Sequence, residues 1–477
     1  MTTETAPPPT APLPVGRALV VGSGSSGLAA ARLLVAADVE VLLVDDSAPA
    51  HAGEAQRLAR ELDAEVVFGR RAVDLLDPSI ELVVPSPGVP ETAPVLTAAL
   101  AAGVAVWSEP ELALRRHPRR LLAVTGTNGK TTTTELLAAM VGAAGLEVHA
   151  CGNIGLPLSA AAAASGADAV LVAELSSFQL RFTHELRPEV AVLLNLADDH
   201  LDWHTGRASY HAAKARIFAA QGPGQWAVAG QDDPVAVALR DASGGGRPAG
   251  FSATTRVTPG VGWRADTGQG VLVSSIDGLA GDLLEVAALA PDGGPVPVHR
   301  TANVAAAATA ALLAGIPTEA VVRAGIAHRP GPHRFETVAI DPRGVRYVND
   351  SKATNVHAAL ASLGAAGPTV WIAGGLAKGV DLAPLSAALG GVHDAVLIGT
   401  AAEELAALCH RAGVRAHQAT DLAAAVETAA RLAAPGDTVL LAPACASFDQ
   451  FTSYAHRGEV FTAAARQVAA TITEVRP

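Results

Sequence analysis

The chain has 477 residues, half of them hydrophobic, so it can bury several cores and is not disordered throughout. Its 34 basic and 46 acidic side chains give a net charge of −12, which argues against the basic surface that holds nucleic-acid phosphates. Only four of the 34 basic residues are lysines: Lys130, Lys214, Lys352 and Lys378.

The N-terminus and the cysteines indicate the compartment. Residues 1–16 are rich in proline, lack the basic and apolar regions of a secretory signal, and are expected to form a disordered leader. Three cysteines cannot build a disulfide framework and favour a reducing environment. No apolar run is long enough to span a membrane. We therefore expect a cytoplasmic protein that binds neither membrane nor nucleic acid.

Short β-branched segments alternate with alanine-rich stretches, which predicts an α/β fold with mostly parallel sheets. Residues 241–300 contain many glycines and prolines and favour short strands at hairpin spacing. The prolines and glycine of 328–332 predict a hinge. After the leader we expect three domains, at 17–110, 111–329 and 330–477. The strands are expected at 17–21, 39–44, 121–124, 169–173, 190–194, 345–348, 369–373, 395–398 and 438–442.

The first glycine-rich loop is Gly22-Ser-Gly-Ser-Ser-Gly27, which follows an expected strand, and Asp45 ends the next strand. This spacing fits a dinucleotide-binding turn with an acid for the ribose. The same geometry suits any diphosphate at a helix N-terminus, including that of a nucleotide sugar. A tight turn that binds no ligand is the alternative.

A second loop, Gly126-Thr-Asn-Gly-Lys-Thr131, lies between a buried strand and a helix. Its backbone N–H groups and the helix N-terminus suit phosphate, Lys130 would neutralise the β- and γ-phosphates, and the Thr131 hydroxyl would ligate Mg²⁺. The spacing between its glycines is shorter than in the standard phosphate loop, and a plain glycine-rich turn is the alternative.

Other polar residues follow strands, at the edge where α/β proteins bind ligands. Glu174 and His200 are plausible Mg²⁺ ligands, although oxygen ligands are the commoner choice. Lys214 stands in a helix-like run, where a lysine is usually solvated. Asp350 could hold a ribose, and Lys352 and Lys378 could hold carboxylates or phosphates. Cys445 has no histidine at a diagnostic place, which favours a small structural cysteine over a nucleophile.

These motifs together resemble the Mur ligase family from about residue 17 to residue 465. The NDSKATN segment at 349–355 and the PACASFDQF segment at 443–451 favour the D-glutamate-adding members over sister ligases. The motifs are TGTNGKTT at 125–132, GNIG at 152–155, ELSSFQL at 174–180, DDHLD at 198–202, Lys214, HRFE at 333–336, NDSKATN at 349–355 and PACASFDQF at 443–451. The resemblance implies an N-terminal Rossmann-like domain for UDP, a central ATPase with a phosphate loop, and a Rossmann-like C-terminal domain that brings the amino acid.

The resemblance also implies a reaction. ATP would phosphorylate the carboxylate of UDP-N-acetylmuramoyl-L-alanine, and the amine of D-glutamate would displace phosphate from the acyl phosphate. This would be a cytoplasmic step of peptidoglycan synthesis, on which cell shape and division depend, carried out by a monomer with two Mg²⁺ ions. Lys214 matches a lysine that CO₂ converts to a carbamate. Because CO₂ adds only to a neutral amine, its normal pKa near 10.4 must be lowered by its surroundings.

Site residues carry over by position. Catalysis is implied for Lys130, Lys214, His200 and Lys352, and metal binding for Thr131, Glu174, His200 and Lys214. ATP binding is implied for Gly126, Thr127, Asn128, Gly129, Lys130, Thr131, Thr132, Asn303, Arg334 and Asp350. Ser25, Ser26, Asp45, Ser86, Gly88 and Asn153 match the UDP-sugar side, while Lys352, Thr354, Lys378, Ser447 and Phe448 match the D-glutamate pocket.

The sequence departs from the family pattern at two nucleotide contacts. Arg300 replaces an asparagine of the usual H-N-x-x-N, and Asp46 and Ser47 stand where some members have Thr-Arg. Three other functions remain open at this point. They are a related amide ligase such as a folylpolyglutamate synthase, an NAD-binding protein that uses the loop at 22–27, and a non-catalytic nucleotide-binding regulator.

Overall fold

The computed structural model describes residues 12–46, 53, 56–57, 60, 64–199, 203–265, 270–290, 296–377 and 379–472. Ser47, His200, Lys378 and residues 1–11 of the expected leader lie outside the described residues. The chain forms two compact units, one within Met1–Pro291 and Thr301–His328, the other within Asp292–Arg300 and Arg329–Pro477. Three sheets rich in parallel pairs confirm the predicted α/β class.

The first sheet of unit one has five parallel strands in the order β3-β2-β1-β4-β5. Its central strands are apolar and buried, as a sheet covered on both faces requires. Leu13 and Val15, at the end of the expected leader, pack against its core. The strands are β1 (Arg17–Val21), β2 (Glu40–Asp45), β3 (Glu65–Phe68), β4 (Leu82–Pro85) and β5 (Ala105–Val106); the helices are α1 (Ser25–Val35), the 3₁₀ helix η1 (Ala72–Leu75), α3 (Pro94–Ala101) and α4 (Glu109–Arg116).

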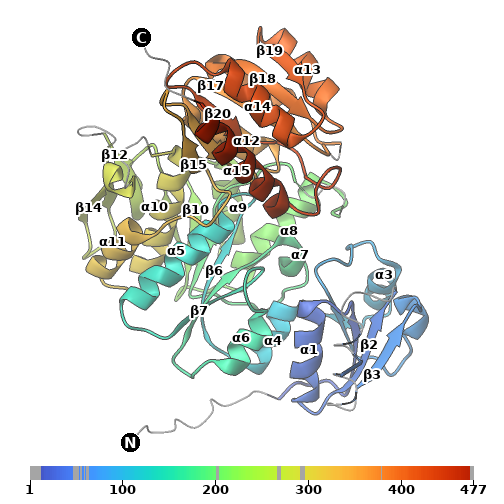
Figure 1. The fold of residues 1–477 in the computed structure, drawn as a ribbon. Coiled ribbons are helices and arrows are strands. Elements are labelled where there is room, and N and C mark those ends of the chain that lie inside the picture. The colour runs from blue at the N-terminus through green and yellow to red at the C-terminus, as the bar shows by residue number, and fades with distance from the viewer. Residues whose placement is uncertain are drawn as a thin grey trace, which may run out of the picture. The chain divides into compact units, whose positions relative to one another are not determined.

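The second sheet of unit one has nine strands in the order β14-β13-β12-β11-β10-β9-β6-β8-β7. Its strands are β6 (Arg120–Thr125), β7 (Val148–Gly152), β8 (Val170–Glu174), β9 (Val190–Leu193), β10 (Trp226–Gly230), β11 (Arg247–Phe251), β12 (Gly260–Arg264), β13 (Val271–Ser274) and β14 (Gly281–Glu285). The helices are α5 (Lys130–Ala143), α6 (Leu158–Ala164), α7 (Ser177–Leu180), α8 (Arg207–Ala219), α9 (Pro234–Ser243), η2 (Val286–Leu289), α10 (Val298–Leu313) and α11 (Thr318–Ala327). Helices α1, α4 and α6 lie side by side between the two sheets (Figure 1).

The short strands expected within 241–300 are present, and their pairing is mixed. Strands β12, β13 and β14 form an antiparallel meander, as the hairpin spacing predicts. Strand β11 pairs with both β10 and β12 in parallel and extends the main sheet. The sequence did not reveal helix α9, which begins at Pro234. Asp233 caps this helix, because its side chain accepts hydrogen bonds from two backbone N–H groups of the first turn.

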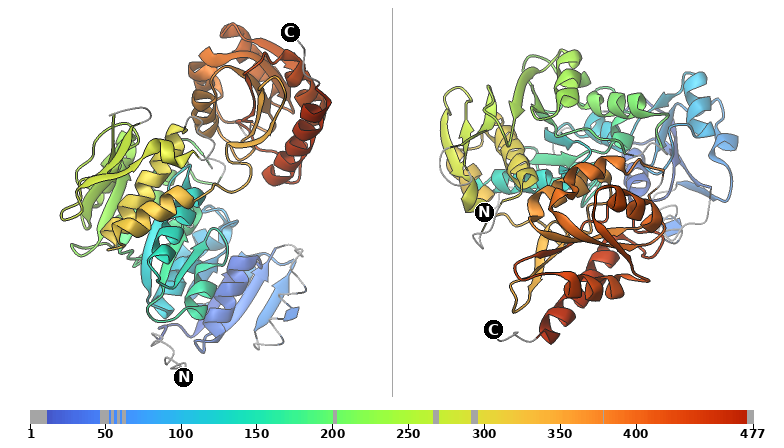
Figure 2. Two further views of the ribbon diagram at one scale, coloured as in Figure 1. Left: turned by 60° about the vertical axis from the view of Figure 1, so that its left-hand side comes forward. Right: turned by 90° about the horizontal axis from the view of Figure 1, so that it is seen from above.

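The second unit contains a six-stranded sheet in the order β15-β16-β20-β17-β18-β19, antiparallel only at β15. Alternate residues of its strands enter two separate cores, so Trp371 lies in one and its neighbours Val370 and Ile372 in the other. The strands are β15 (Glu336–Ile340), β16 (Arg346–Asn349), β17 (Thr369–Gly374), β18 (Val392–Ile398), β19 (Arg415–Gln418) and β20 (Thr438–Leu441). The helices are α12 (Val356–Ala366), η3 (Ala383–Gly391), α13 (Ala402–Arg411), α14 (Leu422–Leu432) and α15 (Tyr454–Thr471). Figures 1 and 2 show the long dark red helix α15, which contacts α14.

Helix ends in this unit follow local capping rules. Asn355, Asp421 and Ser453 each accept a hydrogen bond from a backbone N–H in the first turn of the helix that they begin. The three caps stand at the ends of the loops that follow β16, β19 and β20, so they fix where those loops end.

In the described part of the chain, no helix is both long enough and apolar enough to cross a membrane.

Candidate active site

The loop between β6 and α5 has the backbone that a phosphate loop requires. Gly126 and Gly129 have φ of +152° and +84°, a region that favours glycine. A Cβ on Gly129 would lie 2.4 Å from Oδ1 of Asn303 on α10. Asn195 fixes the loop by accepting from Asn128 N at 2.9 Å and donating to Asn128 O at 3.1 Å. These contacts therefore fix the loop in one conformation at the start of a 14-residue helix.

Lys130 is the first residue of α5 and folds back over this loop. Its Nζ donates to the carbonyl oxygens of Gly126 at 2.9 Å and Thr127 at 2.8 Å. Thr131 and Thr132 follow it in the first helical turn, and the Oγ1 of Thr133 donates to Asn303 Oδ1 at 3.4 Å. The predicted phosphate-binding residues and Asn303 thus meet in unit one, where the helix N-terminus adds partial positive charge.

Glu174 ends β8 beside this loop and is buried. Its Oε1 accepts from Asn153 Nδ2 at 2.9 Å, so the GNIG motif lies against the ELSSFQL motif. Its Oε2 is buried and has no hydrogen-bond partner among the described residues. A buried carboxylate oxygen without a donor is costly, and a divalent cation is the partner that removes this cost. Glu174 therefore fits the predicted role of a Mg²⁺ ligand.

Other ligands would have to complete such a site. Among the described residues, no three His, Cys, Asp or Glu side chains gather in a ready-made metal cluster. His200 lies outside those residues, so its predicted role stays a prediction. Mg²⁺ prefers oxygen ligands and keeps several waters, and Glu174 and the Thr131 hydroxyl are donors of that kind. The residues present fit the predicted ion without forming a closed cage.

Lys214 is a buried side chain on α8, only 1% exposed. Its Nζ donates to Gly126 O at 2.7 Å, so it shares this acceptor with Lys130, and lies 4.8 Å from the centre of the Tyr210 ring. Burial, with the nearby charge of Lys130, holds the Lys214 pKa well below its ordinary value despite Asp199 and Glu174. The expectation from position alone, a solvated lysine, is wrong. The lowered pKa favours the neutral form of this amine, and only the neutral form of an amine can add CO₂.

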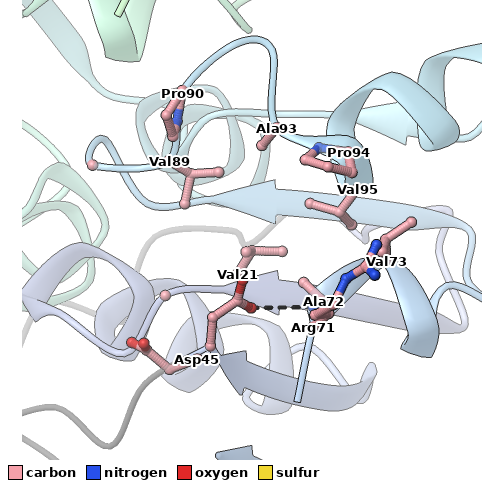
Figure 3. Close-up of a pocket in the computed structure, with 13 residues that line it drawn as sticks. Val21, Asp45, Arg71, Ala72, Val73, Val89, Pro90, Ala93, Pro94 and Val95 are labelled. Carbon is pink, nitrogen blue, oxygen red and sulfur yellow. Dashed lines mark hydrogen bonds between the residues drawn. The ribbon is translucent and has the colours of Figure 1, made fainter. Parts of the chain in front are cut away.

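A pocket of about 250 Å³ opens in the N-terminal sheet (Figure 3). Of the predicted residues, Asp45 and Gly88 line it, together with Arg71, Val89 and Pro90. Asp45 Oδ2 accepts from both the N and the Oγ of Ser23 at 2.8 Å, which anchors the glycine loop to β2.

The remaining predicted residues on this side have other positions. Ser86 Oγ donates to Gly22 O at 3.1 Å and supports the loop from behind. Gly27 is required there, because a Cβ would lie 1.9 Å from Gly22 O. Ser25 and Ser26 form the first turn of α1, next to the loop. Asn153 is held by Glu174, as described above.

Asp350 is the centre of the predicted ATP-binding part of unit two. It accepts from Phe335 N at 3.1 Å and from Ser362 Oγ, and it lies within the field of Arg334. Burial raises its pKa to about 6, against the opposing effect of these hydrogen bonds and of Arg334. His333 and Phe335 have φ of 63° and 52°, so the HRFE segment turns sharply to reach Asp350.

The predicted amino-acid side of unit two is built on two loops. Lys352 Nζ lies 3.9 Å from the centre of the Tyr454 ring, and Thr354 follows it in the NDSKATN segment. In the PACASFDQF segment, Ser447 is buried and Phe448 is 65% exposed. Lys378 lies outside the described residues.

Arg457 joins these two loops and was not found from the sequence. Its guanidinium is fully buried and donates to Ser351 Oγ at 3.0 Å, Ser351 O at 2.9 Å and Cys445 O at 3.1 Å. Burial lowers its pKa to about 10. An arginine in a long amphipathic helix gives no sequence signal of such a role. Arg71 and Asn195 were not predicted as site residues either, since neither belongs to a glycine-rich motif.

The fold and these loops define a class of protein. A phosphate loop with Lys130, the buried carboxylate of Glu174 and a pocket beside a second glycine-rich loop are typical of an enzyme that binds a nucleoside triphosphate and a second phosphorylated ligand. Known proteins then identify the family. Residues 16–108 match the Mur ligase MurD-like N-terminal domain, 124–251 the Mur ligase middle domain, and 333–445 the glutamate ligase domain of Mur ligases. The chain belongs to the Mur ligase family.

Individual relatives agree with this assignment. The chain is 47% identical over 454 residues to the UDP-N-acetylmuramoylalanine–D-glutamate ligase of Frankia casuarinae, covering 94% of this chain and 93% of the relative. It is 42% identical to the protein of the same name from Streptomyces coelicolor, with 94% and 98% covered. Among solved structures, MurF from Acinetobacter baumannii shares the fold, with a TM-score of 0.59, 15% identity, and 94% and 93% covered.

Proposed function

We propose that the chain adds D-glutamate to UDP-N-acetylmuramoyl-L-alanine in an ATP-dependent reaction of peptidoglycan-precursor synthesis. Two relatives that carry this ligase's name are 47% and 42% identical to the chain, and each alignment covers more than nine-tenths of it. One structural observation carries the mechanism: the buried amine of Lys214 lies 2.7 Å from a carbonyl oxygen of the phosphate loop.

The chemistry has two steps. A carboxylate is a poor acyl donor, so its oxygen first attacks the γ-phosphorus of ATP, which forms an acyl phosphate and releases ADP. The amine of D-glutamate then attacks the carbonyl carbon and loses a proton, and phosphate leaves with the former carboxylate oxygen. Both steps concentrate negative charge, so the protein contributes chiefly by positioning groups and neutralising that charge.

Residues of unit one hold the phosphates. The backbone N–H groups at 126–131 and the ammonium of Lys130 would bind the phosphates, and Asn303 supports the loop. Glu174, Thr131 and His200 would hold Mg²⁺, which would supply charge neutralisation for the phosphates. We assign to Lys214 a carbamate, formed when its neutral amine adds CO₂ and loses a proton; the resulting anion offers oxygen ligands that an arginine could not imitate.

The two substrates take the remaining sites. The pocket with Asp45 and Arg71 suits the uridine diphosphate portion, since Arg71 supplies a cation that can pair with a phosphate. Lys352 and Ser447, with Lys378 and Thr354, suit the carboxylates of D-glutamate. Arg334 and Asp350 suit ATP. We further propose that the enzyme acts as a monomer in the cytoplasm, and size-exclusion chromatography tests the first of these statements.

Phosphate release tests the proposal. Turnover is expected with ATP, UDP-N-acetylmuramoyl-L-alanine and D-glutamate together, and none when either acceptor or amino acid is omitted. Activity with a folate and L-glutamate instead would favour the folylpolyglutamate synthase alternative, which the sequence relatives do not support. Tight NAD binding without any effect of Mg-ATP would favour a dinucleotide-binding protein. Lys130→Ala that abolishes nucleotide binding in a chain without ligase activity would favour a regulator.

A further inference from the structure

The loop that follows β4 has two faces. One face lines the nucleotide-sugar pocket with Gly88, Val89 and Pro90. Figure 3 shows Val89 and Pro90 above Val21, the last residue of β1. The next residue, Glu91, does not line that pocket, and its side chain is only 4% exposed. A carboxylate so buried must be hydrogen-bonded, and its partners all belong to the ATP-binding part of unit one.

Glu91 holds the start of helix α8. Its Oε1 accepts from Thr205 N at 2.8 Å and from Ser209 Oγ at 2.7 Å, and its Oε2 accepts from Arg181 Nε at 2.7 Å. Burial opposes ionisation, but the hydrogen bonds from Ser209, Thr205 and Arg181 outweigh it and lower the Glu91 pKa to about 2. The side chain is therefore a carboxylate at neutral pH.

The helix that Glu91 holds leads directly to the catalytic centre. One residue after Ser209, the Tyr210 hydroxyl is 2.8 Å from Thr127 Oγ1 of the phosphate loop. One turn further on, Lys214 Nζ donates to Gly126 O. His204, just before the helix, places Nε2 2.9 Å from Ser177 Oγ in the ELSSFQL motif. A continuous set of contacts thus connects the pocket loop with Lys214.

We propose that Glu91 is a positioning residue that ties the loop lining the nucleotide-sugar pocket to helix α8, and so sets where Lys214 stands relative to the phosphate loop. This inference rests on the proposed function, because it assigns Lys214 a place in that reaction. Glu91 does not line the pocket, and it acts through the hydrogen bonds that it accepts from Thr205 and Ser209. Its removal should therefore change turnover more than binding.

Two variants separate the hydrogen bonds from the charge. Glu91→Ala removes every contact and is expected to lower kcat at least tenfold, while the Kd for UDP, measured calorimetrically without ATP, changes less than threefold. Glu91→Gln keeps an oxygen that can accept from Thr205 and Ser209, and should retain more than half of kcat. Ser209→Ala, which removes one of the two contacts, should give an intermediate loss.

Glu65→Gln is the matched control, since Glu65 lies on β3 of the sheet to which β4 belongs and its side chain is 62% exposed; its kcat should equal that of the wild type. An unchanged kcat in Glu91→Ala would overturn the inference. So would a Glu91→Gln variant as impaired as Glu91→Ala, or a loss of UDP affinity as large as the loss of kcat. An inactive wild type would instead contradict the proposed function, so the two failures can be distinguished. Circular dichroism on each variant verifies that it is folded, and Ser209→Ala still tests the inference if Glu91→Ala is not.

Discussion

Replacing Lys214 separates the role of its amine from that of its bulk. Lys214→Ala empties a fully buried site 2.7 Å from Gly126 O, whereas Lys214→Arg fills it with a group that stays charged and cannot add CO₂. Loss of one preorganised charged group at a reacting centre lowers kcat by about 10²–10³, or roughly 3–4 kcal/mol of transition-state stabilisation. We expect at least that loss in both variants.

The assay is phosphate release with and without small carboxylic acids. Formate or acetate fits the space that Lys214→Ala leaves and restores two oxygen ligands, so its activity should rise with added acid, while that of Lys214→Arg should not. Wild-type activity should also increase with bicarbonate after the buffer has been freed of CO₂. Full activity of Lys214→Ala, or a wild type indifferent to bicarbonate, would refute the carbamate role.

The pKa of Lys214 gives a second, independent test. Because burial lowers it well below 10.5, the folded protein binds fewer protons here than the unfolded chain between the lowered pKa and 10.5. The resulting contribution to stability is present above 10.5 and is lost as the pH falls through the lowered pKa. In CO₂-free buffer, the Tm of the wild-type protein minus that of Lys214→Met should therefore increase as the pH rises. Parallel Tm profiles would contradict a depressed pKa.

Three further predictions concern single contacts. Gly129→Ala should abolish ATP binding by calorimetry, because its Cβ would lie 2.4 Å from Asn303 Oδ1 at a φ of +84°; retained binding would show that the loop can adapt. Asp350→Asn should lower activity yet raise Tm above pH 6, because an acid whose pKa is raised from 3.8 to about 6 destabilises the fold by about 3 kcal/mol when it is ionised. This destabilisation is absent below pH 3.8 and complete above pH 6. A Tm profile equal to that of the wild type would contradict the raised pKa. Cys445→Ala should keep kcat within threefold and native Cys445 should resist iodoacetamide, since burial raises the thiol pKa to about 12; a tenfold loss of kcat would point to a catalytic thiol.

The sequence predicted the architecture because its signals are local. Apolar runs gave the positions of β6, β8 and β9, and the glycines of 126–129 gave the turn that follows β6. Each of these signals comes from the backbone or from a short period, which neighbouring residues determine on their own. Strand partners were less accessible, since the parallel pairing of β11 with β12 depends on contacts across the whole sheet.

The site was predictable where a motif carries chemistry and hidden where only packing does. Lys130 follows β6 and Glu174 ends β8, both in recognisable motifs, and the structure brings both to the same edge of one sheet. Lys214 stands in an ordinary helical run, and its burial comes from residues distant in the sequence. The roles of Arg457 and Glu91 are hidden in the same way. Arg457 binds Ser351 and Glu91 binds Thr205, and each pair is more than 100 positions apart in the sequence.

Transfer of oxygen-18 tests the central claim most directly. UDP-N-acetylmuramoyl-L-alanine labelled in its carboxylate would be incubated with ATP, Mg²⁺ and D-glutamate, and both products would be analysed by mass spectrometry. An acyl-phosphate ligase should form the D-glutamyl amide and transfer one labelled oxygen to inorganic phosphate for each amide formed. Phosphate without label, or no amide that depends on D-glutamate, would contradict the account.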